Sequence, residues 1–121
     1  MNNVTMLICE DEPIIREIMH SFFSRRAREA FVACDGKEGL EMFTSHRPDI
    51  VLTDLKMPVM DGIRLARHIK ETSTTPIIMI SAHNEKELLQ EATRAGVDQF
   101  LFKPIDLEEA AQLIEKVLAE R

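Results

Sequence analysis

The sequence predicts an α/β fold: a doubly wound, five-stranded parallel sheet in which each strand is followed by a helix. Most of the short apolar runs are continuously apolar, which is typical of strands buried on both faces of a sheet. Patterns of helical period fill the intervals between these runs. Strict alternation of strand and helix favours right-handed crossovers, with helices on both faces. The predicted strands are residues 4–9, 30–34, 49–53, 76–80 and 97–102.

The first two strand–helix units have clear boundaries. The helix after VTMLIC carries apolar residues at spacings of one, three and four, which is the pattern of an amphipathic helix. These residues are Ile14, Ile15, Ile18, Met19, Phe22 and Phe23. After AFVAC, Asp35 and Gly36 open the second helix, and Pro48 follows its end.

The last three units repeat this arrangement. The fourth strand, PIIMI, precedes a helix that Asn84 can cap and Gly96 can end. The fifth strand, VDQFLF, is followed by Asp106 and Glu109, which are spaced as a capping box. Apolar stripes mark the three helices at Ile63, Ala66 and Ile69, at Leu88, Leu89 and Ala92, and at Leu107, Ala110, Ala111, Ile114, Val117 and Leu118.

Length and charge narrow the class of protein. The 121 residues are expected to form one domain, residues 1–121. A net charge of −6 argues against nucleic-acid binding by this chain. No apolar run approaches the roughly 20 residues of a membrane span, and no secretory signal is evident, so we expect a cytoplasmic location without membrane contact. Cys9 and Cys34 lie in apolar runs and are predicted to be buried, reduced thiols.

Polar residues follow four of the predicted strands. Glu10 and Asp11 follow the first strand, Asp54 the third, Ser81 the fourth and Lys103 the fifth. In open parallel sheets, ligands bind beyond the carboxyl ends of the strands, where the strand order reverses. In the order 2-1-3-4-5, Asp11 and Asp54 would share that crevice. Ser81 would lie on the other side of Asp54, and the long Lys103 side chain could reach across.

The chemistry of these residues points to a metal ion and a phosphoryl group. Three crowded carboxylates repel one another, and a hard divalent cation relieves that repulsion. Ligands that are all oxygen atoms suit Mg²⁺. A lysine ammonium and a hydroxyl beside such a metal can cradle a phosphoryl group. Asp54 is then the candidate nucleophile, because carboxylates form aspartyl-phosphates.

Four motifs carry a resemblance to a known family. They are LICEDEP (7–13), LTDLKMPVMDG (52–62), IMISAH (78–83) and FLFKP (100–104), in this order and each at the end of a predicted strand. Over its whole length the chain resembles the receiver domain of two-component response regulators. The resemblance implies a flavodoxin-like, CheY-like (βα)5 fold with the strand order 2-1-3-4-5.

The resemblance also implies roles for the acidic residues. Asp54 matches the phosphoacceptor. Asp11 and Asp54 match direct ligands of Mg²⁺, for which Mn²⁺ could substitute. The backbone carbonyl of Lys56 matches the third protein ligand, and Glu10 would act through water. Glu10 stands where the family more often has Asp, which adds one methylene to that contact.

Further roles follow from the other motifs. Ser81 matches the hydroxyl residue that senses the phosphoryl group, and Lys103 matches the lysine that contacts its oxygens. Phe100 matches the aromatic residue that changes rotamer, although it lacks the hydroxyl of the more common Tyr. The Lys103–Pro104 bond is similar to the cis peptide of the family.

Two more positions correspond to places that the family uses to tune the lifetime of the phosphoryl group. They are Lys56 and His83, which lie two residues beyond Asp54 and Ser81.

The function implied is a signalling switch that phosphorylation activates. A sensor histidine kinase or phosphotransfer protein would donate the phosphoryl group to Asp54 in a Mg²⁺-dependent reaction. The fourth helix, fifth strand and fifth helix would then change, to control an output domain, a partner protein or a phosphorylation-dependent homodimer. The chain would be no enzyme toward a separate substrate, and would catalyse only its own phosphorylation and dephosphorylation.

Three alternative functions fit the sequence less well than the switch. A Mg²⁺-dependent phosphatase with an aspartyl-phosphate usually needs a second carboxylate two residues after the nucleophile, where this chain has Lys56. A flavin-binding protein would need a phosphate loop after the first strand, whereas EDEP would repel the cofactor phosphate. An unphosphorylated scaffold of the same fold is disfavoured because the acid, hydroxyl and lysine set is intact.

Overall fold

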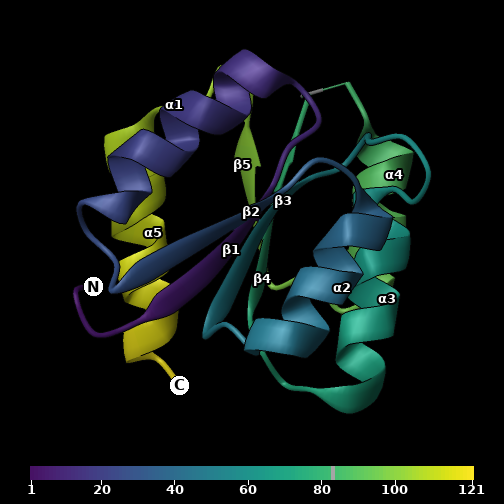
Figure 1. The fold of residues 1–121 in the computed structure, drawn as a ribbon. Helices are drawn as coiled ribbons and strands as arrows, with labels where there is room; N and C mark the ends of the chain where they lie inside the picture. The colour runs from purple at the N-terminus through teal and green to yellow at the C-terminus, as the bar shows by residue number, and fades with distance from the viewer. Residues whose placement is uncertain (83) are drawn as a thin grey trace.

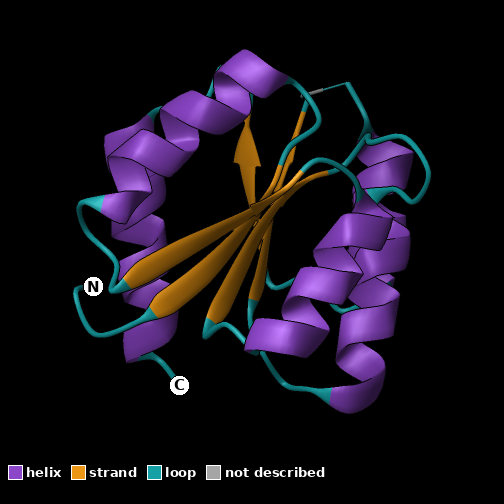
Figure 2. Ribbon diagram, in the orientation of Figure 1, coloured by secondary structure: helices purple, strands orange, loops and turns teal. Residues whose placement is uncertain are grey.

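The computed structural model describes residues 1–82 and 84–121, and within them it has one five-stranded parallel sheet in the predicted order β2-β1-β3-β4-β5. Helices α1 and α5 cover one face of the sheet, and α2, α3 and α4 cover the other (Figures 1 and 2). The strands are β1 Thr5–Cys9, β2 Glu29–Ala33, β3 Ile50–Asp54, β4 Ile77–Ser81 and β5 Gln99–Phe102. The helices are α1 Pro13–Ser24, α2 Gly36–His46, α3 Gly62–Thr72, α4 Lys86–Arg94 and α5 Leu107–Ala119.

The central strands are buried on both faces, as their continuous apolar runs predicted. Every residue of β1, β3 and β4 is buried, whereas the edge strands β2 and β5 are partly exposed. Because side chains alternate across a strand, Leu7 and Val51 pack toward α2 and α3, and Ile8 and Leu52 pack toward α1 and α5. Two apolar cores therefore hold the sheet between its helix layers.

Strand ends differ from the prediction by one or two residues, and the difference matters at the site. Asp54 and Ser81 are the last residues of β3 and β4 rather than the first residues after them, because both still pair with the neighbouring strand. Both side chains are consequently buried at the end of the sheet. Cys9 is buried as predicted, but Cys34 lies just past the edge strand β2 and is only half-buried; both are free thiols.

Helix α1 buries only part of its apolar stripe. Met19 and Phe23 are buried, but Ile14, Ile15 and Ile18 have exposed fractions of 75%, 37% and 54%. A stripe of this spacing normally faces the core along its whole length. The first turns of α1 lie near the carboxyl ends of the strands, at the top of Figure 1, where the sheet no longer lies beneath the helix.

Aspartates cap three of the helices. The side chains of Asp35, Asp61 and Asp106 each accept a hydrogen bond from the backbone N–H three residues on, at 2.8, 2.9 and 3.2 Å. The expected cap of α4 was wrong: the N-cap is Glu85 rather than Asn84, and the Glu85 carboxylate does not cap the helix. Instead it pairs with Lys56 of the β3–α3 loop.

The β3–α3 loop is folded tightly against the end of β3. The Gly62 N–H donates to the Leu55 carbonyl at 2.8 Å, and a Cβ at Gly62 would overlap the Asp54 carbonyl oxygen. Within the same loop, Val59 has φ +70°, a left-handed conformation that is costly for a β-branched residue. The β3–α3 loop, which follows Asp54, therefore contains local backbone strain at Val59.

No helix among the described residues is both long and apolar enough to cross a membrane.

Replacing the strained residue should stabilise the protein. We expect Val59→Asn to raise the free energy of unfolding by about 1 kcal/mol, because Asn adopts the left-handed region more readily than Val. Little burial is lost, since Val59 is largely exposed. Val59→Thr, which stays β-branched, is the matched control and should give no gain. Urea unfolding of the three proteins measures this; identical midpoints would show that the conformation costs nothing.

Candidate functional site

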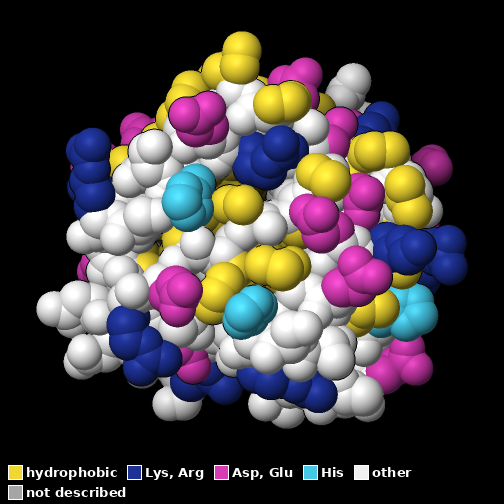
Figure 3. All heavy atoms as spheres, in the orientation of Figure 1, with side chains coloured by type: hydrophobic (Ala, Val, Ile, Leu, Met, Phe, Trp, Pro, Cys, Tyr) yellow, Lys and Arg dark blue, Asp and Glu magenta, His cyan; other side chains and the backbone are white. Residues whose placement is uncertain are grey.

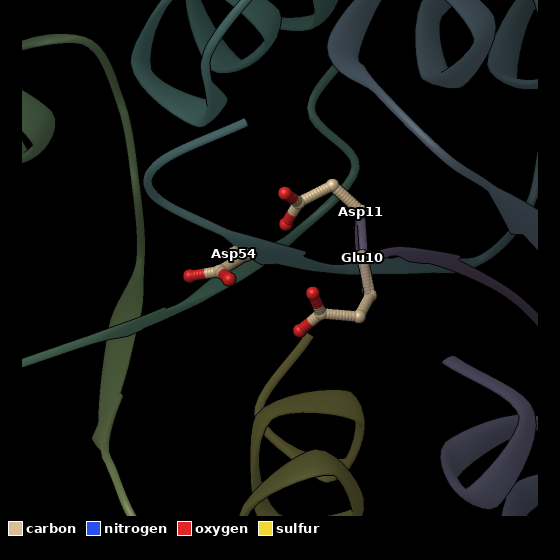
Figure 4. Close-up of side chains that lie close together, drawn as sticks. All are labelled: Glu10, Asp11 and Asp54. Atoms are coloured by element: carbon tan, nitrogen blue, oxygen red, sulfur yellow. The ribbon is translucent and has the colours of Figure 1, made fainter. Parts of the chain in front are cut away.

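Three acidic side chains meet at the carboxyl ends of β1 and β3. Glu10 and Asp11 follow β1, and Asp54 ends β3. One carboxylate oxygen from each residue lies within 4.8 Å of the others. Figure 4 shows the three carboxylates gathered around one space. The strand order brings them together, because β1 and β3 are neighbours in the sheet although a strand and two helices separate them in sequence.

Asp54 is held by two donors. Its Oδ1 atom accepts a hydrogen bond from the Leu55 N–H at 2.9 Å, and its Oδ2 atom accepts one from the Lys103 Nζ atom at 3.1 Å. Asp54 is only 3% exposed, so this carboxylate has left bulk water. Lys103 follows β5 and reaches across β4 to make the contact, as the strand order predicted.

The carboxylates carry more negative charge than the lysine offsets. Burial raises the pKa of Asp54, although the hydrogen bond and charge of Lys103 oppose the rise. Burial also raises the pKa of Glu10 to about 7; the Glu12 N–H opposes this, and the charges of Asp54 and Asp11 add to it. Burial alone would lower the pKa of Lys103, but its hydrogen bond to Asp54 and the surrounding carboxylates raise it. An oxygen-ligated divalent cation fits a cluster of this charge.

Arg16 holds the acidic loop in place, a role that sequence reasoning missed. Its Nη1 atom donates to the backbone carbonyls of Glu10 and Asp11, at 2.9 and 3.3 Å. The Glu12 N–H meanwhile donates to the Glu10 carboxylate at 3.0 Å. The only signal in the sequence was an arginine one helical turn past the acidic run, which is too common to be specific. The β1–α1 loop is therefore fixed by its own backbone and by α1.

The remaining predicted residues lie around this centre. Ser81 is buried at the end of β4, and its Oγ atom donates to the Ala82 carbonyl at 3.3 Å. Phe100 is half-buried in β5, opposite Met79 of β4, and packs against the apolar core shared by α2, α3 and α4. The Lys103–Pro104 peptide bond is cis.

Of the two positions predicted to tune the lifetime of the phosphoryl group, Lys56 and His83, the structure describes only Lys56. The Lys56 Nζ atom pairs with the Glu85 Oε1 atom at 3.2 Å, a contact that sequence reasoning did not foresee. The sequence pattern does not relate these residues, because Lys56 lies between β3 and α3 whereas Glu85 lies between β4 and α4. His83 lies outside the described residues.

An apolar hollow of about 420 Å³ adjoins the acidic cluster. Its lining includes Ile15 and Ile18 of α1, Pro104 and Leu107 near the start of α5, and the charged residues Glu10 and Lys103. Figure 3 shows apolar side chains gathered at the top of the molecule, where the first turns of α1 lie in Figure 1. The buried carboxylate thus lies beside an exposed apolar surface.

The chain is similar to many known proteins. The family model described as response regulator receiver domain matches residues 6–115. Sporulation initiation phosphotransferase F of Bacillus subtilis is 32% identical over 98% of this chain and 96% of its own length. Regulatory protein AtoC of Escherichia coli is 34% identical over 93% of this chain, and CseB of Streptomyces avermitilis is 36% identical over 94%. The chain spans about a quarter of AtoC and about half of CseB.

Solved structures agree with this. The chemotaxis response regulator CheY4 of Vibrio cholerae has a TM-score of 0.87 and 27% identity, covering 95% of this chain and 98% of its own. A receiver domain of a Francisella response regulator has a TM-score of 0.88 and 28% identity, with 98% of both chains covered. Receiver domains bind Mg²⁺ through an acidic cluster, and Glu10, Asp11 and Asp54 form one here. The chain therefore belongs to the response regulator receiver domain family, the phosphorylation-activated signalling modules of two-component systems.

Proposed function

We propose that this chain, as one receiver domain over residues 1–121, accepts a phosphoryl group on Asp54 in a Mg²⁺-dependent reaction. One observation carries the proposal: the Asp54 carboxylate belongs both to the acidic cluster and to the ion pair with Lys103. A metal ion and a lysine could therefore flank the same oxygen atoms. Asp11 and Asp54 would bind Mg²⁺ directly, with the Lys56 carbonyl as a third ligand and Glu10 acting through water.

The transfer needs little from the protein beyond position and charge. An Asp54 carboxylate oxygen attacks the phosphorus, the bond from phosphorus to the donor histidine nitrogen breaks, and the imidazole leaves with that electron pair. When bound, Mg²⁺ would neutralise charge on the phosphoryl oxygens. The Lys103 ammonium, already 3.1 Å from Asp54 Oδ2, pairs with one of these oxygens. Ser81, at the end of the next strand, offers its hydroxyl to another.

The module turns over no separate substrate in this proposal. A phosphatase using the same intermediate would need an acid two residues after Asp54, and the side chain there is the Lys56 ammonium, paired with Glu85. The chain therefore catalyses only its own phosphorylation and dephosphorylation. Its output would be an attached domain, as the greater lengths of AtoC and CseB suggest, a separate partner or a phosphorylation-dependent homodimer.

Helix α1 supplies a surface for the phosphodonor. The apolar patch formed by Ile14, Ile15 and Ile18 is exposed, although such residues normally lie inside a protein. It adjoins the hollow that Glu10 and Lys103 help to line, so a protein bound there would lie beside Asp54. We assign the patch to a cytoplasmic sensor histidine kinase or phosphotransfer protein that presents its phosphohistidine to Asp54.

The signal would leave through α4, β5 and α5. The phosphoryl group would draw the Ser81 hydroxyl inward and bind Lys103, and Phe100 would move into the space that Ser81 leaves. Phe100 packs against the core that contains residues of α4, so its movement would change the packing of α4. A hydrogen bond to a charged group contributes roughly 1.5–3 kcal/mol, whereas reversing a switch from 1:99 to 99:1 takes about 5.5 kcal/mol. Two such contacts are therefore needed.

Asp54 should be the site of labelling. We expect acetyl phosphate with Mg²⁺ to add one phosphoryl group to the parent protein, and to add none to Asp54→Asn or to the parent in EDTA. Intact-mass spectrometry measures the added mass. Glu91→Gln, far from the acidic cluster on the exposed face of α4, is the control and should label as the parent does. Labelling of Asp54→Asn at the parental rate would refute the assignment.

The two phosphoryl contacts should contribute separately to switching. We expect Ser81→Ala and Lys103→Ala to retain some phosphorylation but to switch incompletely, because each variant loses one of two contacts. NMR amide shifts on adding Mg²⁺ and beryllofluoride, a phosphoryl mimic, measure the response over residues 84–118. In the parent, changes confined to the surroundings of Asp54 would show that the α4–β5–α5 face does not respond.

The α1 patch should affect protein donors and not small ones. We expect Ile18→Ser to slow transfer at least tenfold from any phosphorylated histidine phosphotransfer domain that labels the parent. The rate from acetyl phosphate should stay the same, because that donor needs no docking surface. Ile18 is more than half exposed, so the fold should tolerate the change. Equal transfer rates from the protein donor to both forms would exclude the patch as its docking surface.

A further inference from the structure

The ion pair between Lys56 and Glu85 ties together two loops at the carboxyl edge of the sheet. Lys56 lies in the β3–α3 loop, two residues after Asp54, and Glu85 is the last residue before α4. The Nζ–Oε1 distance is 3.2 Å. A hollow of about 490 Å³ lies at this contact and is lined by both residues and by Asn84, Lys86 and Leu88. The contact therefore links the loop that follows Asp54 to the start of α4.

The Glu85 carboxylate is in an unfavourable position without this lysine. Its side chain is only 12% exposed, whereas that of Lys56 is 69% exposed. Its second oxygen, Oε2, is buried and has no hydrogen-bond partner among the described residues. The start of α4 offers some favourable potential, but the carboxylate makes no capping bond there. A buried carboxylate is stable only while it is paired, and among the described residues Lys56 is the partner that pairs with Glu85.

Phosphorylation would place a stronger anion within reach of the same lysine. Residues two apart have Cα atoms at most about 7 Å from each other, so the flexible Lys56 side chain can turn toward the group on Asp54. A phosphoryl group carries close to two negative charges, against one on Glu85. One positive charge would then face two anions, so the phosphoryl group would weaken the pairing of Lys56 with Glu85.

We propose that Glu85 is a positioning residue for Lys56 and that the phosphoryl group on Asp54 competes for this lysine. Loss of Lys56 leaves the Glu85 carboxylate buried without a counter-charge, so the β4–α4 loop moves to return it to water. Because the Glu85 carbonyl accepts the Leu89 N–H at 2.9 Å, this movement displaces the first turn of α4. The inference rests on the phosphorylation of Asp54 proposed above. It adds a route to α4 that is separate from Ser81 and Phe100.

Paired variants test this route. Lys56→Gln should move the resting amide shifts of residues 84–94 toward the positions that the parent reaches with Mg²⁺ and beryllofluoride. Glu85→Gln removes the buried charge, so it should reduce the amide shift changes of residues 86–94 on adding beryllofluoride by half or more. The shift changes of residues 99–118 should stay as in the parent. The double variant should return residues 84–94 to the resting positions of the parent. A merely structural role for Glu85 would predict additive damage instead of this recovery.

A matched control is the exposed ion pair between Arg67 of α3 and Glu91 of α4, at 3.2 Å. Glu91→Gln should leave the response of α4 intact. Resting shifts of Lys56→Gln that match the parent, or a full α4 response in Glu85→Gln, would overturn the inference.

Intact-mass labelling with acetyl phosphate is run on the same samples. A parent that labels on Asp54 while the NMR predictions fail would refute only the role of Glu85. A parent that takes up no phosphoryl group would overturn both proposals.

Discussion

The structure depends on one constraint: a carboxylate must be held out of water at the end of a buried strand. Asp54 still belongs to the β3 ladder, which is why it is 3% exposed, and two donors partly offset the cost of that burial. Neighbouring Glu10 and Asp11 add negative charge instead of relieving it. The protein thus maintains a site that is electrostatically unbalanced, and this imbalance favours the binding of a cation.

The sheet explains why so few residues suffice to build such a site. In a parallel sheet the carboxyl ends of all strands lie at the same end of the sheet. Residues that follow different strands therefore converge there without long-range pairing of side chains. Lys103 comes from the far edge strand and spans β4 to reach Asp54. The close approach of Gly62 to the Asp54 carbonyl then closes the β3–α3 loop over the strand end. Backbone geometry does most of the positioning.

The sequence allowed the alternation of strands and helices to be predicted from period, and the strand order and the acidic cluster to be predicted from the motifs shared with receiver domains. Continuous apolar runs predicted strands that are buried on both faces of the sheet. The order 2-1-3-4-5 came from the resemblance to receiver domains, and that order brought Asp11 next to Asp54. Strand ends were less predictable: whether Asp54 ends β3 or follows it depends on its pairing with Ile80 of β4. The predicted cap of α4 was wrong because Asn is locally the better capping residue, so Asn84 was chosen. The observed N-cap residue is Glu85, and its carboxylate pairs with Lys56 of another loop.

The exposed part of α1 could not be predicted for a different reason. Apolar spacing shows that Ile14, Ile15 and Ile18 share a side of the helix with Met19, but not how far the sheet extends beneath it. Contacts between a helix and a loop, such as that of Arg16 in α1 with the carbonyl of Glu10, depend on side-chain reach and leave no periodic signal. The features missed from sequence are therefore those in which two loops, or a helix end and a loop, meet.

In the proposed switch, the two states of the domain differ in how two lysines pair with the anions at the carboxyl ends of the strands. In the resting structure Lys103 pairs with Asp54 and Lys56 pairs with Glu85. A phosphoryl group on Asp54 would add charge at one position only, so the existing pairs could no longer both be optimal. Bound by Glu10, Asp11 and Asp54, Mg²⁺ would offset part of that charge, and Glu85 does not belong to this cluster. The segment before α4 carries the buried Glu85 carboxylate, so its movement into water would lower the free energy most once Lys56 turns away.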